Sequence, residues 1–336
     1  MRSLLTTCSK KRPNILVSTT SGWNPGDDFI REGVRRVTES VIGCEANWFT
    51  HNRNPDMDGV RVDPVSNHVG INHLDMPWDL VVFAGTPEWD SWRTKPILEH
   101  LARTPDLPVL FFGIGSANLG ERPGSLALEV MRSARSLVIC RNIDLNQTLT
   151  DLGVASRVLP CPGFLCQETT GHQKHGKLLV FQDSVSSHVR TTEMFERTML
   201  EAVDRGWALV CHAHQESFRA MQKDIPFIYD NDYHRLMKLL ASSEMVVSTR
   251  LHGAIAAASS LTPSIITGSN NNFRVTAAAA PLSIAMINDP KEAIQTAEYW
   301  LTSGMAQQEK NRLASLRSET ESTYREILRQ FLWVNR

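Results

Sequence analysis

The sequence has no uninterrupted apolar run that approaches the roughly 20 residues of a membrane-spanning helix. Its amino terminus, MRSLLTTCSK, also lacks the ~7–15 apolar residues of a secretion signal. Neither sign of charge is in excess, because 35 basic residues face 36 acidic ones and the net charge is −1. This balance argues against a nucleic-acid partner and against a disordered acidic tail. We therefore expect a cytoplasmic protein, either free or in peripheral contact with a membrane.

Signatures of metal and cofactor binding are scarce. The six cysteines are scattered, with no close pair at zinc-ligand spacing, so we expect reduced thiols, several of them buried. His212 and His214 share one face of a strand end near Glu216, and the wall of a core or cleft explains them better than a metal site. The glycines of GWNPG and GIGSANLG miss the spacing of a phosphate loop or a dinucleotide fingerprint. Neither a metal ion nor an organic cofactor is expected.

Strand-like and helix-like segments alternate along nearly the whole chain. Apolar, β-branched runs predict strands, and apolar residues at helical spacing predict helices. Strands are expected at 14–20, 79–85, 108–115, 136–141, 178–182, 207–213, 226–230, 244–248 and 263–267. Helices are expected at 29–41, 125–134, 143–153, 191–206 and 233–243. Continuous apolar strands alternating with helices indicate an α/β protein with doubly wound parallel sheets covered on both faces.

The chain is long enough for two domains of ordinary size, with 336 residues of which 42% are apolar. The polar stretch QETTGHQKHGK, at 167–177, has no apolar periodicity and predicts the linker between them. Two facing Rossmann-like domains are expected, at residues 1–166 and 178–290. The remainder, 291–336, predicts C-terminal helices that pack on the body. A contact with a second copy or with a membrane surface is the alternative for their apolar side chains.

The segment STRLHGAIAAASS places Arg250 and His252 between an apolar strand and a helix of small residues. Ligands bind at this edge of a parallel sheet, where helix amino termini offer free N–H groups. For Arg250, binding of an anion is favoured over a surface ion pair. His252 is either a helix-start histidine bonded to backbone or a catalytic acid, and an anionic ligand nearby would favour the protonated, acid-competent ring. Gly253 and the alanines keep the helix slim enough for close approach.

The segment GWNPGDDFI follows the first predicted strand and precedes a helix. Asn24 and Gly26 allow a tight turn there. Asp27 or Asp28 would cap the helix, and Asp27 is equally suited to accept a proton from a substrate hydroxyl.

Two further arginines are candidates for binding an anion. Arg141 ends the predicted strand SLVICR at a carboxyl edge, and Arg274 lies in GSNNNFR. A salt-bridged arginine is the alternative interpretation of each.

Several segments, in their order along the chain, resemble the polysaccharide pyruvyl transferase family. STRLHGAIAAASSLTPSI is similar to its signature of an apolar strand, Ser-x-Arg-Leu-His-Gly, a small-residue helix and a proline-led strand. GWNPGDDFI resembles the family pattern Gly-Asn-x-Gly-Asp-x-x-Ile, with one residue more between the first glycine and Asp27. DLVVFAGTPEW and CRNIDLNQTLTDLGV resemble two further blocks. The resemblance extends from about residue 14 to about residue 280, and the Arg-Leu-His-Gly block is its most specific part.

The resemblance implies two facing Rossmann-like domains of the GT-B kind, with the acceptor on the N-terminal side and the donor on the C-terminal side. It implies a transferase that moves an enolpyruvyl unit from phosphoenolpyruvate to two sugar hydroxyls, leaving a pyruvate ketal. Arg250 would then hold the donor's anionic groups, and His252 would protonate its methylene carbon. The acceptor would be a lipid-linked or nucleotide-linked sugar, or a finished glycan. The residues assigned to substrate binding besides Arg250 are Leu251, Gly253, Asn24, Gly26, Arg141 and Arg274.

The chain departs from the family pattern at three places. Arg141-Asn142 stands where the family usually has Arg-Asp, Cys161-Pro162 where Asp-Pro is common, and Gly85-Thr86-Pro87 replaces a glycine-rich turn. Two rival functions therefore remain, a GT-B glycosyltransferase that uses a nucleotide sugar and a non-catalytic protein that binds a glycan or an anion. The absence of glutamate between Met245 and Lys291 counts against the first, because many retaining glycosyltransferases hold the donor ribose with one.

Overall fold

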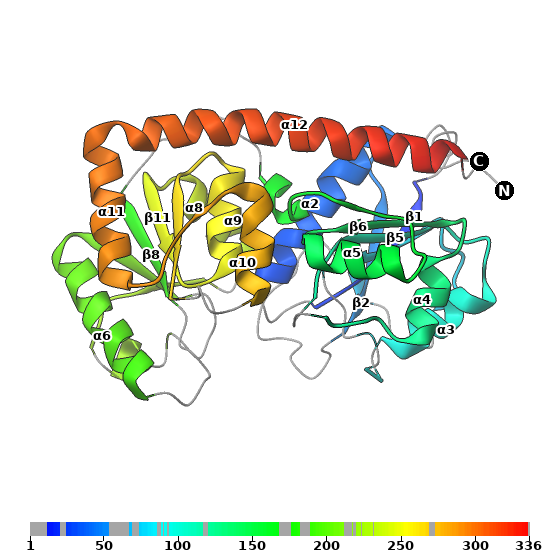
Figure 1. Cartoon of the computed structure of the whole chain (residues 1–336), viewed down its shortest axis with the longest axis horizontal. Coiled ribbons are helices and arrows are strands. Elements are labelled where there is room, and N and C mark those ends of the chain that lie inside the picture. Colours follow the sequence, from blue (N-terminus) through cyan, green and yellow to red (C-terminus); the bar gives the residue numbers. More distant parts are fainter. Residues whose placement is uncertain are drawn as a thin grey trace.

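A computed structural model describes residues 12–20, 25–53, 67–68, 74–85, 89, 91–92, 94–116, 120–167, 176–181, 189–211, 217, 220–222, 224–230, 232–268 and 273–334. Within these residues the strands form one seven-stranded and one six-stranded sheet (Figure 1). Every strand pairing in both sheets is parallel.

The first sheet has the strand order β3-β2-β1-β4-β5-β6-β7. Its strands are β1 (Asn14–Thr19), β2 (Asn47–Asn52), β3 (Asn67–His68), β4 (Leu80–Ala84), β5 (Val109–Ile114), β6 (Ser136–Cys140) and β7 (Ser156–Val158). The helices between them are α2 (Pro25–Ile42), α3 (Lys95–Arg103), α4 (Ser125–Met131) and α5 (Ile143–Asp151). The winding direction reverses between β1 and β4, and a ligand crevice forms at such a switch point beyond the carboxyl ends of the strands.

The second sheet repeats this plan with the order β10-β9-β8-β11-β12-β13. Its strands are β8 (Lys177–Phe181), β9 (Trp207–Cys211), β10 (Ile228–Tyr229), β11 (Met245–Ser248), β12 (Ser264–Thr267) and β13 (Ala285–Ile287). Its helices are α6 (Val189–Asp204), α8 (Tyr233–Ala241), α9 (Leu251–Ser259) and α10 (Phe273–Ala279), the last followed by the 3₁₀ turn η4 (Ala280–Leu282). The switch point lies between β8 and β11, so both sheets carry their reversal next to their first strand.

The expected α/β class with doubly wound parallel sheets is confirmed. The central strands β4, β5 and β11 are buried at every position, as continuous apolar runs predict for strands covered on both faces. Helix α9 is likewise buried along its whole length, because its alanines and Gly253 let it lie close to the sheet.

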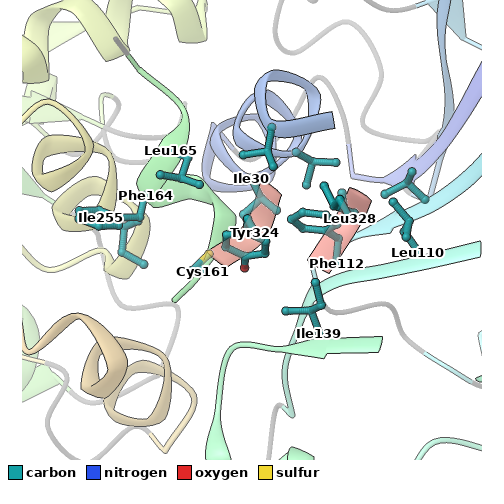
Figure 2. Close-up of a cluster of buried hydrophobic side chains, with 14 of the residues drawn as sticks. Ile30, Leu110, Phe112, Ile139, Cys161, Phe164, Leu165, Ile255, Tyr324 and Leu328 are labelled. Carbon is teal, nitrogen blue, oxygen red and sulfur yellow. The ribbon is translucent and has the colours of Figure 1, made fainter. Parts of the chain in front are cut away.

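A short 3₁₀ turn, η3 (Pro162–Leu165), lies between the helices of the two halves. Its Phe164 and Leu165 belong to one apolar cluster together with Ile30 of α2 and Ile255 of α9 (Figure 2). A Cβ on Gly33 of α2 would lie 1.8 Å from the carbonyl oxygen of Pro162, so glycine alone permits this contact. The two sheets therefore share a continuous core.

The chain ends in α11 (Pro290–Ser303) and the long helix α12 (Met305–Val334), and α12 runs along the molecule beside both sheets (Figure 1). Tyr324 stacks on Phe112 with ring centroids 4.9 Å apart and donates its hydroxyl proton to Pro160 O over 2.7 Å. Arg317 donates to the carbonyl oxygens of Phe164 and Ser259, each at 2.7 Å, and to that of Gln167. Helix α12 is thus bonded to the chain segment that joins the two sheets.

Four cysteines, Cys140, Cys161, Cys166 and Cys211, are free and buried, as expected. The expectation of reduced thiols is wrong for Cys44, which takes part in a disulfide. Among the described residues, no helix is both long enough and apolar enough to cross a membrane.

Candidate active site

The start of α9 is built around the side chain of Ser248, the last residue of β11. Its hydroxyl donates to Arg250 O over 2.7 Å and accepts from Arg250 N over 3.1 Å. These bonds hold Arg250 in the extended conformation of a helix N-cap, with φ −105° and ψ 125°. A Cβ on Gly253 would lie 2.7 Å from the same hydroxyl oxygen, so glycine is required there. The turn places Arg250 and His252 at the carboxyl edge of the second sheet, as predicted.

The start of α2 meets this turn from the other half of the protein. The helix begins at Pro25, so Asp27 and Asp28 lie within its first turn and the capping interpretation of both is wrong. A Cβ on Gly26 would lie 2.4 Å from Nδ1 of His252, which shows that the imidazole packs directly against the Gly26 backbone. Two predicted site segments that are distant in sequence are therefore in contact.

Arg141 joins them from the end of β6. Its Nη1 lies 3.4 Å from Nε2 of His252, across 111 positions of sequence. The Arg141 side chain is 1% exposed and crosses over Gly115, where a Cβ would lie 2.7 Å from Nε of Arg141. Arg141 also contacts the buried thiol of Cys161, and the guanidinium partly opposes the rise in the thiol's pKa that burial causes. The same burial lowers the pKa of Arg141 itself.

The imidazole of His252 is neutral in this arrangement. Burial lowers its pKa well below the usual value, and the positive charges of Arg141, Arg274 and Arg250 lower it further. A guanidinium can only donate, so Nε2 of His252 accepts from Arg141 and the ring proton resides on Nδ1. An anion bound among these arginines would reverse the electrostatic part of the shift.

Asp27 as a whole residue is half-buried, and its carboxyl group lies in the field of several arginines. Its pKa is raised because burial outweighs the opposing charges of Arg53, Arg274, Arg141 and Arg31. A raised pKa keeps a carboxylate closer to the range in which it exchanges protons with a substrate.

Arginines from both halves thus surround one small region. Arg31 is paired with Asp28 over 3.0 Å, and both side chains are buried. Arg141 and Arg274 act through their charges on both His252 and Asp27, while Arg250 acts on His252 and Arg53 on Asp27. Positive charge exceeds negative charge in this group, which suits a ligand with more than one negative charge.

The structure brings together most of the residues predicted for the site. Seven of them lie at the facing carboxyl edges of the two sheets: Gly26, Asp27, Arg141, Arg250, Leu251, His252 and Gly253. Arg274 lies at the surface on α10 and acts on His252 through its charge. Asn24 lies outside the described residues, as do His212, His214 and Glu216.

Sequence reasoning missed two residues of the site. Arg53 directly follows β2, is buried, and donates Nη2 to Ala84 O over 3.0 Å. Asn142 follows Arg141, is 2% exposed, and donates Nδ2 to Ser116 Oγ over 3.0 Å. Arg53 carries the same signal as Arg141, an arginine at a strand's carboxyl end, but its strand was not recognised.

A sequence model of the family described as polysaccharide pyruvyl transferase matches residues 24–271 of the chain. The match includes both segments that meet at His252 and nearly all of the region in which the resemblance was noted. A search of curated protein sequences found no match.

Solved structures similar to this one confirm the GT-B-like arrangement of two Rossmann-like parts. UDP-GlcNAc 2-epimerase from Neisseria meningitidis, bound to UDP-GlcNAc, is 9% identical with a TM-score of 0.59 over 95% of this chain and 99% of that one. The α,α-trehalose 6-phosphate synthase from Burkholderia multivorans is 14% identical with a TM-score of 0.53 over 96% and 99%. At such identities the similarity shows the fold alone.

Proposed function

Because the chain belongs to the polysaccharide pyruvyl transferase family, we propose that it transfers an enolpyruvyl unit from phosphoenolpyruvate to two hydroxyls of a sugar. The product is a pyruvate ketal on a glycan or glycan precursor, and the by-product is inorganic phosphate. The observation that carries this proposal is the contact of His252 with Arg141 over 3.4 Å, inside a group of arginines from both halves.

The surplus positive charge fits the donor. Phosphoenolpyruvate carries a carboxylate and a phosphate close together, and guanidinium groups bind both kinds of oxyanion in bidentate geometry. Arg250 and Arg141 come from opposite sheets and are suited to hold the donor between the two halves. The amino terminus of α9 adds its helix dipole on the same side.

His252 is proposed as the acid of the first step. Binding of a multiply charged anion offsets the field of the arginines and favours a second proton on the ring. The imidazolium then protonates the methylene carbon of the enol, which leaves a cationic carbon stabilised by the adjacent oxygen. One sugar hydroxyl adds to that carbon and the second displaces phosphate. One hydroxyl proton returns to the acid–base group and the other leaves with the phosphate.

Asp27 is proposed to assist the attacking hydroxyl. It lies in the N-terminal half, one residue after the Gly26 backbone that packs on the imidazole. Its raised pKa suits a group that accepts a proton from a hydroxyl and releases it again. This assignment puts the sugar on the N-terminal side of the crevice and the donor on the C-terminal side. The scheme requires neither a metal ion nor an organic cofactor.

A thermal-shift screen tests the donor before the acceptor is known. Phosphoenolpyruvate is expected to raise the melting temperature, and the Arg250→Ala variant is expected to lose most of the rise. UDP-sugars and GDP-sugars form the comparison set for the rival glycosyltransferase function. A rise with a nucleotide sugar and none with phosphoenolpyruvate would overturn the proposal.

Phosphate release then tests the reaction itself. Lipid-linked sugars, nucleotide-linked sugars and finished glycans are the three acceptor classes to compare. His252→Ala is expected to abolish phosphate release while leaving binding of phosphoenolpyruvate largely intact. Donor binding without phosphate release from the unaltered protein, whichever acceptor is added, would instead indicate a non-catalytic binding protein.

A further inference from the structure

The side chain of Cys161 lies where the segment that joins the two sheets meets the proposed active site. Cys161 immediately precedes η3, is fully buried, and belongs to the apolar cluster around that turn (Figure 2). Its carbonyl oxygen accepts from Phe164 N over 2.9 Å, which fixes the start of the turn. Two residues earlier, Leu159 N donates to Cys140 O over 2.9 Å. Cys161 is therefore fixed relative both to η3 and to the end of β6, from which Arg141 extends.

Arg141 is held at several points between β6 and His252. Its backbone N donates to Ile114 O over 2.8 Å, and its Nη1 lies 3.4 Å from Nε2 of His252. The guanidinium also donates to the thiol of Cys161, whose sulfur accepts from Gly163 N as well. A guanidinium is planar, so each acceptor bonded to it restricts its rotation. The thiol and the imidazole nitrogen together therefore orient the end of the Arg141 side chain.

The thiol is a neutral partner for the guanidinium. Its pKa is raised, because burial and the charge of Asp27 outweigh the lowering by Arg141 and by a backbone N–H. The hydroxyl of Tyr324 lies near the thiol and stays protonated, because burial raises its pKa. The other charged side chains that act on Arg141 are Asp27, of opposite sign, and Arg274, of the same sign. A neutral thiol accepts a hydrogen bond without cancelling the charge of its donor, so Cys161 holds Arg141 in place and preserves its positive charge.

We propose that Cys161 is a positioning residue, whose thiol holds the guanidinium of Arg141 against the imidazole of His252. Because Cys161 leads into the turn that packs between the two halves, it also connects that packing to the geometry of the site. The consequence for donor binding rests on the proposed function. The effect on His252 does not, because it exists in the ligand-free protein.

NMR titration of His252 in the ligand-free protein tests the positioning. Cys161→Ala removes an acceptor of the guanidinium, so the positive charge is no longer fixed beside Nε2. The pKa of His252 should then rise towards its value in Arg141→Gln. Cys161→Val also lacks an acceptor but fills the space, so it should have the same effect and separates that effect from the creation of a cavity. Cys161→Ser keeps a small neutral acceptor and should leave the pKa close to that of the unaltered protein.

Cys166→Ala is the matched control. Cys166 is also a buried thiol at η3, 1% exposed, and its sulfur lies 3.3 Å from Oγ of Ser259. The pKa of His252 should not change in this variant. A change equal to that in Cys161→Ala would show a general effect of substitution in the core and would overturn the proposal.

The Arg141→Gln background shows whether the thiol acts through Arg141. Without a guanidinium to orient, Cys161→Ala should leave the pKa of His252 unchanged there. An equal rise in both backgrounds, or no rise in the otherwise unaltered protein, overturns the proposal. In donor titrations Cys161→Ala is expected to weaken binding of phosphoenolpyruvate about fivefold, as for the loss of one hydrogen bond. If the pKa changes occur but phosphoenolpyruvate does not bind the unaltered protein, the proposed function fails and the positioning role stands.

Discussion

The protonation of His252 depends on its contacts with Arg141 and with the backbone of Gly26. The first supplies a positive charge next to Nε2, and the second excludes water from the Nδ1 side. Both effects disfavour the imidazolium in the ligand-free protein. The acid role proposed for His252 therefore requires that an anionic ligand accompany its proton.

Titration of His252 by NMR tests this coupling and needs no acceptor. In the free protein the pKa of His252 should lie well below the usual histidine value, and phosphoenolpyruvate should raise it. Between these two pKa values donor binding takes up a proton, so affinity should increase as the pH falls through that window. Arg141→Gln should raise the pKa of the free protein, whereas Arg141→Lys, which keeps the charge, should change it less. A pKa that is identical with and without donor would contradict the coupling.

The Gly26→Ala variant tests whether the backbone contact positions the ring. Alanine favours a helix relative to glycine, which offsets part of the ~1–3 kcal/mol that overpacking costs, so stability towards urea should fall only modestly. The new Cβ would lie 2.4 Å from Nδ1, so the ring must move. Because a displacement of ~1 Å can cost about 100-fold in rate, phosphate release should fall by roughly that factor. The pKa of His252, measured by NMR, should change in this variant because the ring has moved, and a loss of rate with an unchanged pKa would show that Gly26 acts by another route.

At the scale of elements, the turn after β11 positions Arg250 through one hydroxyl group. Ser248→Ala removes both bonds to Arg250 and should cost about 1 kcal/mol of unfolding free energy. It should also weaken binding of phosphoenolpyruvate, because Arg250 loses its fixed N-cap conformation. Ser264→Ala is the matched control, since Ser264 is also buried and donates to Ala254 O of the same helix over 3.2 Å. Urea unfolding should show similar losses of stability for the two variants. Donor titration should show weaker binding for Ser248→Ala than for Ser264→Ala. Equal affinities would argue against a positioning role.

The apolar pattern predicted the central elements well and the edge elements poorly. Strands such as β4 and β5 are buried on both faces, and their continuous apolar runs reveal them. Strand β2 reads NWFTHN, and its buried residues include Thr50 and His51, which hydrophobicity does not mark. Because β2 was not predicted from the sequence, Arg53 at its carboxyl end was not recognised as a candidate site residue. The Arg-Leu-His-Gly segment was recognised because a charged pair between apolar runs has no packing explanation.

At the scale of the whole molecule, the sequence identified the segments of the site but not their contacts. The meeting of Gly26 with His252 and of Arg141 with His252 depends on how two sheets pack across η3. That packing rests on close approaches such as Gly33 to Pro162, and no local pattern encodes a contact between elements so far apart. The cluster in Figure 2 holds residues of both halves in one core, which fixes the distance between the two edges.

The buried arginine of α12 should make the two sheets unfold as one unit. Arg317 donates to Phe164 O in η3 and to Ser259 O at the end of α9, so it bonds the joining segment to the second sheet's helix. Replacing it with methionine keeps much of the volume but leaves buried carbonyl oxygens without a donor, at ~1–3 kcal/mol each. Differential scanning calorimetry should show one transition for the unaltered protein. For Arg317→Met it should show a lower melting temperature and a transition that broadens or splits.

Tyr324→Phe gives a reference value for the stability lost in Arg317→Met. It removes one hydrogen bond, to Pro160 O, and keeps the ring stacked on Phe112. The expected cost is about 1 kcal/mol, with a single transition retained. Arg317→Met must therefore be distinctly more damaging than Tyr324→Phe. If both variants have the same melting temperature and each unfolds in one transition, the Arg317 hydrogen bonds are not needed for the two sheets to unfold together. The apolar contacts around η3 would then account for the cooperative unfolding.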